Sequence, residues 1–165
     1  PAPQLRITQE NNNVFDILVY VFENCRQADL SHDTDRVAKK LTAAGFEESD
    51  IHEAMSWLAG VVHARQRSLA PLPERGDALR VFAPKELLKL DVECRGFLMY
   101  LERTGILTPS TREHVIERAL AAIGDAISLE QLKLIVLMVL WNQRTPASQL
   151  IAEELLSARG VRLPS

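Results

Sequence analysis

Residues 132–141 read LKLIVLMVLW, and this stretch decides the predicted fold. Every residue in it except Lys133 is apolar, so a helix here would lack a solvent-facing side for most of its length and should lie centrally. Ser128 and Gln131 precede it with the spacing of a capping box, which predicts where the helix begins. Its most apolar part, Ile135–Trp141, is much shorter than the roughly 20 residues that cross a membrane. We therefore predict a soluble, all-α protein built around one buried helix.

Amphipathic helices are predicted on both sides of this stretch, and we expect them to pack against it. Cap and turn signals place them after Pro84, then at Asp91–Thr104, Thr108–Ile123 and from Thr145 to about Ala158. The second of these has Val92, Phe97, Leu98 and Leu101 as its apolar residues, with Asp91 and Arg95 at the i,i+4 spacing of an ion pair. Gly96 disfavours this helix by roughly 1 kcal/mol relative to alanine, so we expect another helix to approach closely there.

The N-terminal part of the chain predicts three more helices. Apolar spacing places them at 14–26, 35–44 and 48–65, and Gly45 is suited to end the second one. The proline- and glycine-containing stretch that follows is typical of a linker, and the first thirteen residues predict a flexible leader or extension. The predicted architecture is an all-α, multi-helix bundle with a leader at 1–13, a small N-terminal three-helix lobe at 14–66, a linker at 67–83 and a C-terminal four-helix lobe at 84–165 around the buried apolar helix.

Composition and charge argue against a disordered chain, a protein with a basic face for nucleic acid, and a disulfide-rich secreted protein. With 47% apolar and 25% charged residues, the 165-residue chain is ordinary for a globular protein. The net charge is −3, and residues 14–66 carry five basic and nine acidic side chains, so no basic face for phosphates is visible. Cys25 and Cys94 form neither a metal-binding spacing nor a disulfide framework, and no signal peptide is recognisable. We expect a cytoplasmic protein with two reduced thiols.

The turn around Gly105 is the most suggestive candidate for nucleic-acid binding. Helix, short glycine turn and helix form the outline of a helix-turn-helix, in which the first residues of the second helix read the major groove. Ser110, Thr111, Arg112 and His114 would be the readers, because each can hydrogen-bond a base or a phosphate. An ordinary pair of antiparallel helices has the same outline, and the two glutamates on this helix would repel phosphates.

The sequence carries no recognisable catalytic pattern. Its four histidines have no metal-ligand spacing, and neither a phosphate-binding glycine loop nor a nucleophile elbow occurs. Arg95 could lower the pKa of the neighbouring Cys94 thiol, but that cysteine lacks a histidine base and is better explained by helix packing. We predict a protein that is not an enzyme and that holds no cofactor and no metal.

A candidate protein-binding site lies at the turn between the second and third predicted helices. Gly45 and Phe46, followed by Asp50 and Trp57, are similar to the glycine–phenylalanine turn of ubiquitin-associated three-helix modules. The segment also resembles the helical repeats of the RecX recombination regulators, and proteins of both kinds bind other proteins. Any compact triplet of helices converges on this pattern, so the prediction that remains is a small protein-binding bundle with these four residues as its site.

Several stretches of the chain resemble the bacterial Smg family. They are VFDILVYVFE at 14–23, AGF at 44–46 with DI at 50–51 and WL at 57–58, CRGFL at 94–98 with LE at 101–102, RE at 112–113 with VIER at 115–118, and a closing block from LK at 132–133 through VLMVL at 136–140 to NQ at 142–143. The resemblance covers essentially everything after the leader. It implies a start near Val14 and a gene that commonly neighbours a DNA-processing gene, but no catalytic or binding residue.

Two functions follow as hypotheses. The first is a non-catalytic helical adaptor or regulator that binds another cytoplasmic protein, because catalytic patterns are absent and an acidic three-helix lobe adjoins a neutral helical lobe. The alternative is a nucleic-acid-associated protein that uses the helix-turn-helix-like element Ser110–His114 in DNA processing. A membrane partner is not expected.

Overall fold

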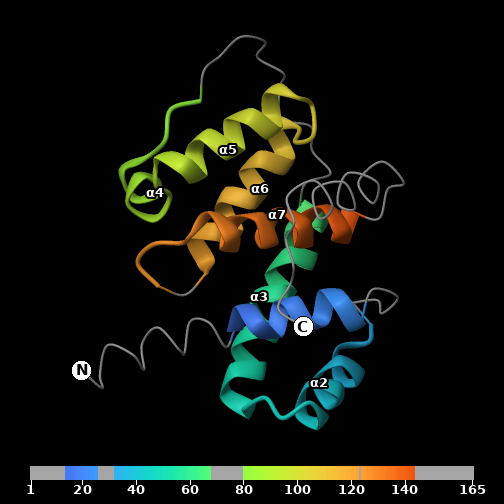
Figure 1. The fold of residues 1–165 in the computed structure, drawn as a ribbon. Coiled ribbons are helices and arrows are strands. Elements are labelled where there is room, and N and C mark those ends of the chain that lie inside the picture. The colour runs from blue at the N-terminus through green and yellow to red at the C-terminus, as the bar shows by residue number, and fades with distance from the viewer. Residues whose placement is uncertain (1–13, 26–31, 68–79, 123, 144–165) are drawn as a thin grey trace, which may run out of the picture. The chain divides into compact units, whose positions relative to one another are not determined.

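The computed structural model in Figure 1 describes residues 14–25, 32–67, 80–122 and 124–143. Over these ranges the backbone forms seven helices and no strand, which confirms the all-α class. The helices are 14–24, α2 (Thr34–Ala43), α3 (Glu48–Arg67), α4 (Pro84–Lys89), α5 (Val92–Arg103), α6 (Pro109–Ala121) and α7 (Leu129–Gln143). The predicted leader, most of the predicted linker and the predicted last helix lie outside the described residues.

Two compact units divide the chain, Pro1–Val62 and His63–Ser165. The boundary falls inside α3, which is one continuous helix in the backbone. The predicted lobes at 14–66 and 84–165 and the linker at 67–83 stay predictions, and each unit is described by itself below.

Three amphipathic helices supply the core of the first unit, as their apolar spacing predicts. The helix at 14–24 buries Ile17, Leu18 and Val21, and α2 buries Val37 and Leu41. The first part of α3 buries a third set of apolar side chains, Ile51, Ala54, Trp57, Leu58 and Val61. The rings of Tyr20 and Phe46 meet edge to face, with centroids 5.7 Å apart, so the turn after α2 contacts the 14–24 helix.

Gly45 ends α2 in the way the sequence predicts. Its φ of +96° lies in the left-handed region, where a residue with a Cβ would be strained. The Phe46 N–H donates to the Leu41 carbonyl at 3.3 Å and the Gly45 N–H donates to the Thr42 carbonyl at 3.1 Å, which is the Schellman pattern. Gly105 has a φ of +80° and ends α5 at the predicted turn.

The helices of the second unit begin at the predicted caps. The Thr108 hydroxyl accepts from the Thr111 N–H at 3.1 Å, and Pro109 takes the first position of α6. Ser128 and Gln131 form the reciprocal capping box before α7, with hydrogen bonds of 2.9 and 3.2 Å. These two starts are confirmed because caps depend on residues only three positions apart.

The predicted ion pair between the Asp91 and Arg95 side chains is wrong, because each of them bonds to a backbone group. The Asp91 carboxylate instead accepts from the Cys94 N–H at 2.8 Å and caps α5, while Arg95 Nε donates to the backbone carbonyl of Asp91 at 3.3 Å. An aspartate just before a helix satisfies an orphan N–H there, and this local bond holds the carboxylate in place.

Helix α7 is buried around almost its whole circumference, which confirms the prediction from LKLIVLMVLW. Leu132 and all residues from Leu134 to Asn142 are buried, and only Lys133 in this stretch reaches further toward solvent. Within the second unit α7 contacts α5 and α6, and Figure 1 shows it lying across α6. None of the helices in the described ranges is long and apolar enough to cross a membrane.

A buried lysine joins α4 to the turn between α6 and α7. The Lys89 ammonium donates to the carbonyls of Ala122 and Gly124, and the Lys89 carbonyl accepts from the Ile127 N–H at 3.1 Å. The lysine thus satisfies carbonyls at the end of α6, where the helix dipole favours a cation. Burial lowers the pKa of Lys89 from its usual value.

Candidate functional site

The predicted nucleic-acid residues lie in the first turns of α6, where two of them are buried. Thr111 and His114 are each only 8% exposed, whereas Ser110 and Arg112 are partly exposed. The Thr111 hydroxyl lies 2.9 Å from the Thr108 hydroxyl and accepts from Gln143 Nε2 at 3.0 Å. Thr111 therefore connects the start of α6 to the end of α7, and the prediction that these residues read bases is not tested by this placement.

Arg112 is held by two carboxylates. It forms ion pairs with Glu102 at the end of α5 and with Glu113 next to it, the latter at 2.9 Å, and its side chain is only 12% exposed. Because two acidic partners surround it, the positive charge of Arg112 is compensated within the fold. This arrangement does not favour a phosphate.

These groups belong to a larger charge cluster, which we define as Arg80, Glu86, Glu102, Arg112 and Glu113. Arg80, in front of α4, donates to both oxygens of Glu86 at 2.9 Å and to both oxygens of Glu113. Its guanidinium also lies 4.9 Å from the centroid of the Phe82 ring. The charge cluster joins the segment before α4 to α4, α5 and α6.

The electrostatics of the charge cluster favour ionised carboxylates. Hydrogen bonds from Arg80 hold the pKa of Glu86 below its usual value, and Glu86 also accepts from the Ala83 N–H at 2.8 Å. Burial alone would raise the pKa of Glu113, but hydrogen bonds from Arg80 and Arg112 outweigh it and the pKa is lowered. Three carboxylates against two guanidiniums leave the charge cluster with one net negative charge, and a net negative charge repels phosphates.

His114 lies on the buried side of α6. Burial lowers the pKa of its imidazole, and its Nε2 has no hydrogen-bond partner among the described residues. A neutral imidazole is therefore the form that this environment favours at neutral pH. Because His114 is only 8% exposed, it offers little surface to a ligand in solvent.

The predicted protein-binding residues lie at the turn between α2 and α3 and along the first half of α3. Gly45 is exposed at the turn, Phe46 is half-buried against Tyr20, and Asp50 is half-buried in the first turn of α3. Trp57 is buried, and it belongs to the core of the first unit. The site as a whole stays a prediction.

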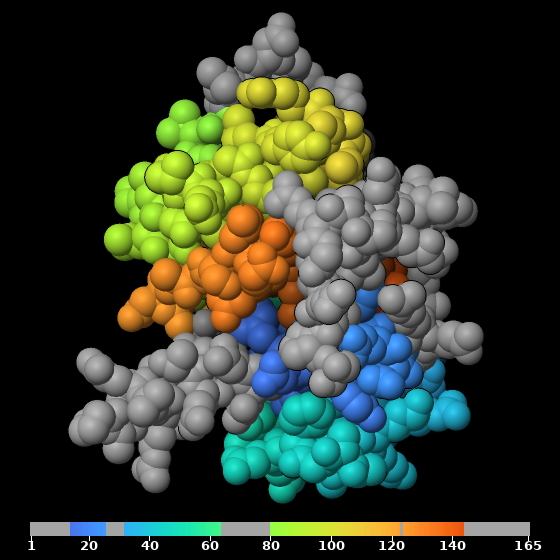
Figure 2. All heavy atoms as spheres, viewed as in Figure 1, coloured from blue at the N-terminus to red at the C-terminus, as the bar shows by residue number. Residues whose placement is uncertain are grey.

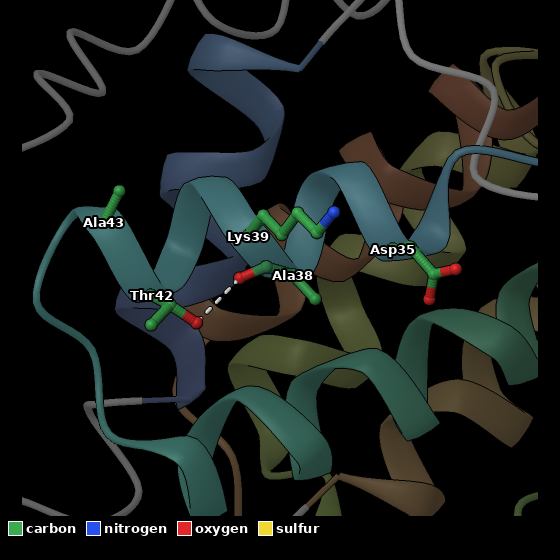
Figure 3. Close-up of a pocket in the computed structure, with 5 residues that line it drawn as sticks. All are labelled: Asp35, Ala38, Lys39, Thr42 and Ala43. Atoms are coloured by element: carbon green, nitrogen blue, oxygen red, sulfur yellow. Dashed lines mark hydrogen bonds between the residues drawn. The ribbon is translucent and has the colours of Figure 1, made fainter.

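A surface hollow lies along α2. Its lining residues all come from this one helix: Asp35, Ala38, Lys39, Thr42 and Ala43. Figure 3 shows that the Asp35 and Lys39 side chains point in different directions, while the Thr42 hydroxyl donates to the Ala38 carbonyl at 3.0 Å. The hollow therefore has no set of converging polar groups of the kind that catalysis requires.

Both cysteines are free and buried. The Cys94 side chain is fully buried and its sulfur lies 3.7 Å from the Ile127 carbonyl oxygen. Burial raises the pKa of Cys94 to about 12, so the thiol stays protonated and weakly nucleophilic. The interpretation of Cys94 as a helix-packing thiol agrees with this environment.

No three potential metal ligands come together within the described part of the chain.

Sequence reasoning missed a group of exposed apolar side chains. In the described part of the chain all exposed large apolar residues lie between positions 81 and 100: Val81, Leu87, Leu88, Val92 and Tyr100. Figure 2 shows atoms of α4 and the start of α5, in light green, at the surface of the second unit. Val92 was expected on the apolar side of α5, but it is 74% exposed because the buried residues of that helix centre on Phe97, Leu98 and Leu101. A helical wheel of α5 would have shown that Val92 lies on a different side from Phe97, Leu98 and Leu101.

The expected close approach of a helix at Gly96 is also wrong. Gly96 is exposed, and a Cβ built there would meet no atom within 4 Å in the described structure. Without a side chain, Gly96 leaves the helix backbone uncovered on the outward side of α5. No described contact in the second unit offsets the low helix propensity of this glycine.

Comparison with known proteins gives close relatives along most of the chain. A family model described as "Protein of unknown function (DUF494)" matches residues 14–163. "Protein Smg homolog" of Aromatoleum aromaticum is 48% identical over 87% of this chain and 93% of the relative. The "Protein Smg homolog" of Azoarcus sp. strain BH72 is 43% identical over 88% and 94%, and that of Methylococcus capsulatus is 47% identical over 79% and 83%. No solved structure matches. This chain belongs to the Smg homolog family.

Proposed function

We propose that this protein is a non-catalytic adaptor or regulator that binds another cytoplasmic protein through α4 and the segment before it. The observation that carries the proposal is the exposure of Val81, Leu87 and Leu88, which are 87%, 44% and 79% accessible. A group of exposed apolar side chains is a common mark of a protein–protein contact.

Helix α4 supports this proposal because its amphipathic character is inverted. Its polar residues Glu86 and Lys89 are buried, whereas Leu87 and Leu88 between them are exposed. Glu86 is held by Arg80 and by the Ala83 N–H, and Lys89 is held by two carbonyls of the turn after α6. Buried polar contacts at both ends thus fix this short helix with its leucines outward.

Such anchoring matters for binding energy. An isolated helix of six residues would not hold its shape in water, so the polar contacts rather than helix propensity keep α4 in place. A surface that is rigid before binding loses less conformational entropy when a partner docks. We therefore assign Leu88 as the central contact and an apolar surface as the chemistry of the partner.

The proposed architecture around this surface keeps the predicted lobes, a three-helix N-terminal lobe and a C-terminal four-helix lobe around α7. The two buried, free cysteines are in keeping with a reducing compartment such as the cytoplasm. Gly45, Phe46, Asp50 and Trp57 remain a second candidate for protein contact, and the exposed Gly45 turn is the part of it that a partner could reach.

Nucleic-acid association through Ser110–His114 is the less favoured alternative. Thr111 and His114 are buried and the charge of Arg112 is compensated by two glutamates, so little positive potential is left for phosphates. Fluorescence anisotropy at low salt with double- and single-stranded DNA and RNA tests this alternative directly. Binding that is lost in Arg112→Ala would favour it over protein docking.

The test of the adaptor proposal places a photo-crosslinking amino acid at Leu88 of the full chain in cells at native expression. We expect a discrete crosslinked protein that co-purifies with the wild-type chain and is lost from Leu88→Glu. Thr42→Glu, which adds the same charge at an exposed position on α2, is the control and should retain the partner. Equal recovery of the same proteins with Leu88→Glu, or none above a tag-only control, would contradict the proposal.

A further inference from the structure

The outward side of α5 has features that no described contact within the second unit explains. Val92 is 74% exposed, Tyr100 is 53% exposed, and the exposed Gly96 lies midway between them. Residues four apart lie on one side of a helix, so these three form a continuous stripe. The stripe has two apolar ends and, at its centre, a place where no Cβ occupies space.

Opposite charges accompany this stripe. Glu93 lies in the first turn of α5 and Arg103 in its last turn, and both are exposed. Neither side chain forms an ion pair with another described residue. The two ends of the stripe therefore carry charges of opposite sign that are open to a partner.

We propose that the stripe Val92–Gly96–Tyr100 binds the same stripe of a second copy of this chain, with the two α5 helices antiparallel. A two-fold symmetric contact needs a surface that is complementary to itself. This stripe meets that condition, because its two apolar residues lie at equal distances on either side of Gly96. Rotation about an axis near Gly96 places Val92 of each copy against Tyr100 of the other. Glycine at the crossing point lets the two backbones approach closely.

The charges select the antiparallel orientation. The midpoint between Glu93 and Arg103 is Leu98, which lies only about half a helical turn along the axis from Gly96. In the antiparallel pair each glutamate therefore lies toward the arginine of the other copy. A parallel pair would bring glutamate against glutamate and arginine against arginine, which is repulsive. This inference does not depend on the proposed docking of another protein to α4.

Sedimentation velocity of the full chain over a concentration series tests the inference. We expect the mass to rise from the 18.5 kDa of one chain to twice that value as concentration increases. Gly96→Leu and Tyr100→Glu should each stay monomeric with unchanged helical circular dichroism. The leucine has room in the monomer, because a Cβ at this position meets nothing within 4 Å. Leu88→Glu, which blocks the proposed docking surface on α4, should leave the dimer intact.

A charge exchange tests the pairing and its direction. Glu93→Arg and Arg103→Glu should each weaken the dimer about tenfold, because the two-fold axis makes each reversal replace two exposed attractions with repulsions, and the double variant should recover most of that loss. A monomer at all concentrations up to about 1 mM, where even weak association is detectable, would overturn the inference. Dimers that persist in both Gly96→Leu and Tyr100→Glu, or a double variant no better than the single ones, would overturn it as well.

Discussion

A charge at Leu137 should unfold the second unit. Leu137 is 2% exposed, and its neighbours from Leu134 to Asn142 are all buried. Replacing a core leucine with alanine costs about 2–5 kcal/mol, and an unpaired buried carboxylate costs several kcal/mol more. The whole free energy of unfolding of a domain is about 5–15 kcal/mol. The cost of Leu137→Asp is therefore comparable to the entire stability, and we expect the variant to lose its second unit at room temperature.

Tryptophan fluorescence separates the two units in this experiment. The chain has two tryptophans, Trp57 in the first unit and Trp141 in the second. In a Trp57→Phe background, emission from Trp141 reports on the second unit alone. We expect red-shifted emission and reduced helical circular dichroism for Leu137→Asp. The control Leu137→Met keeps the volume and should cost less than about 1.5 kcal/mol. Native emission and a cooperative transition in Leu137→Asp would refute the argument that α7 is core.

Four further outcomes are expected. Gly96→Ala should raise the free energy of unfolding by about 0.5–1 kcal/mol in dilute solution, measured by urea denaturation, because Gly96 has open space; a loss of stability would contradict this. Glu113→Gln should lower stability at neutral pH by about 1 kcal/mol, because solvent screens the ion pairs of this partly exposed side chain, and it should flatten the acid limb of a stability–pH curve. The reason is that the pKa of Glu113 is lower in the folded than in the unfolded protein. Its contribution to the free energy of unfolding is therefore fully present at pH values above the unfolded pKa and is lost as pH falls through the folded pKa. His114 has a lowered pKa, so stability should decline as pH falls below about 6.5, and His114→Gln should reduce that decline. Cys94, with its pKa raised to about 12, should react with a thiol reagent only after unfolding in urea; rapid reaction of the native protein would contradict its burial.

Helix boundaries in this chain could be predicted because the signals for them are local. Thr108, Ser128 and Gly45 each act on backbone groups within a few residues, and the structure has all three in the expected roles. The central α7 could also be predicted, since a helix without a polar side can only be buried. Asp91 was assigned the wrong partner because two local interactions compete there, and the cap prevails over the ion pair.

The surface features could not be predicted in the same way. A helical wheel places Gly96 on the same side of α5 as Val92, but whether another helix covers that side is decided by packing at distant positions. Leu87 and Leu88 look like core residues in the sequence, yet Glu86 and Lys89 take the inward positions. Their partners, Arg80 and the carbonyls after α6, are brought to them by tertiary structure alone.

The sequence by itself determined the all-α class, the helix caps and the buried stretch LKLIVLMVLW, because each depends on the composition or spacing of neighbouring residues. It also placed the chain near the Smg family. Only the tertiary structure decided that Thr111 and His114 are buried, that Arg112 is neutralised by two glutamates, and that α4 and α5 expose their apolar side chains. Burial and charge compensation arise from groups far apart in the chain, and their pairing exists only once the helices have packed.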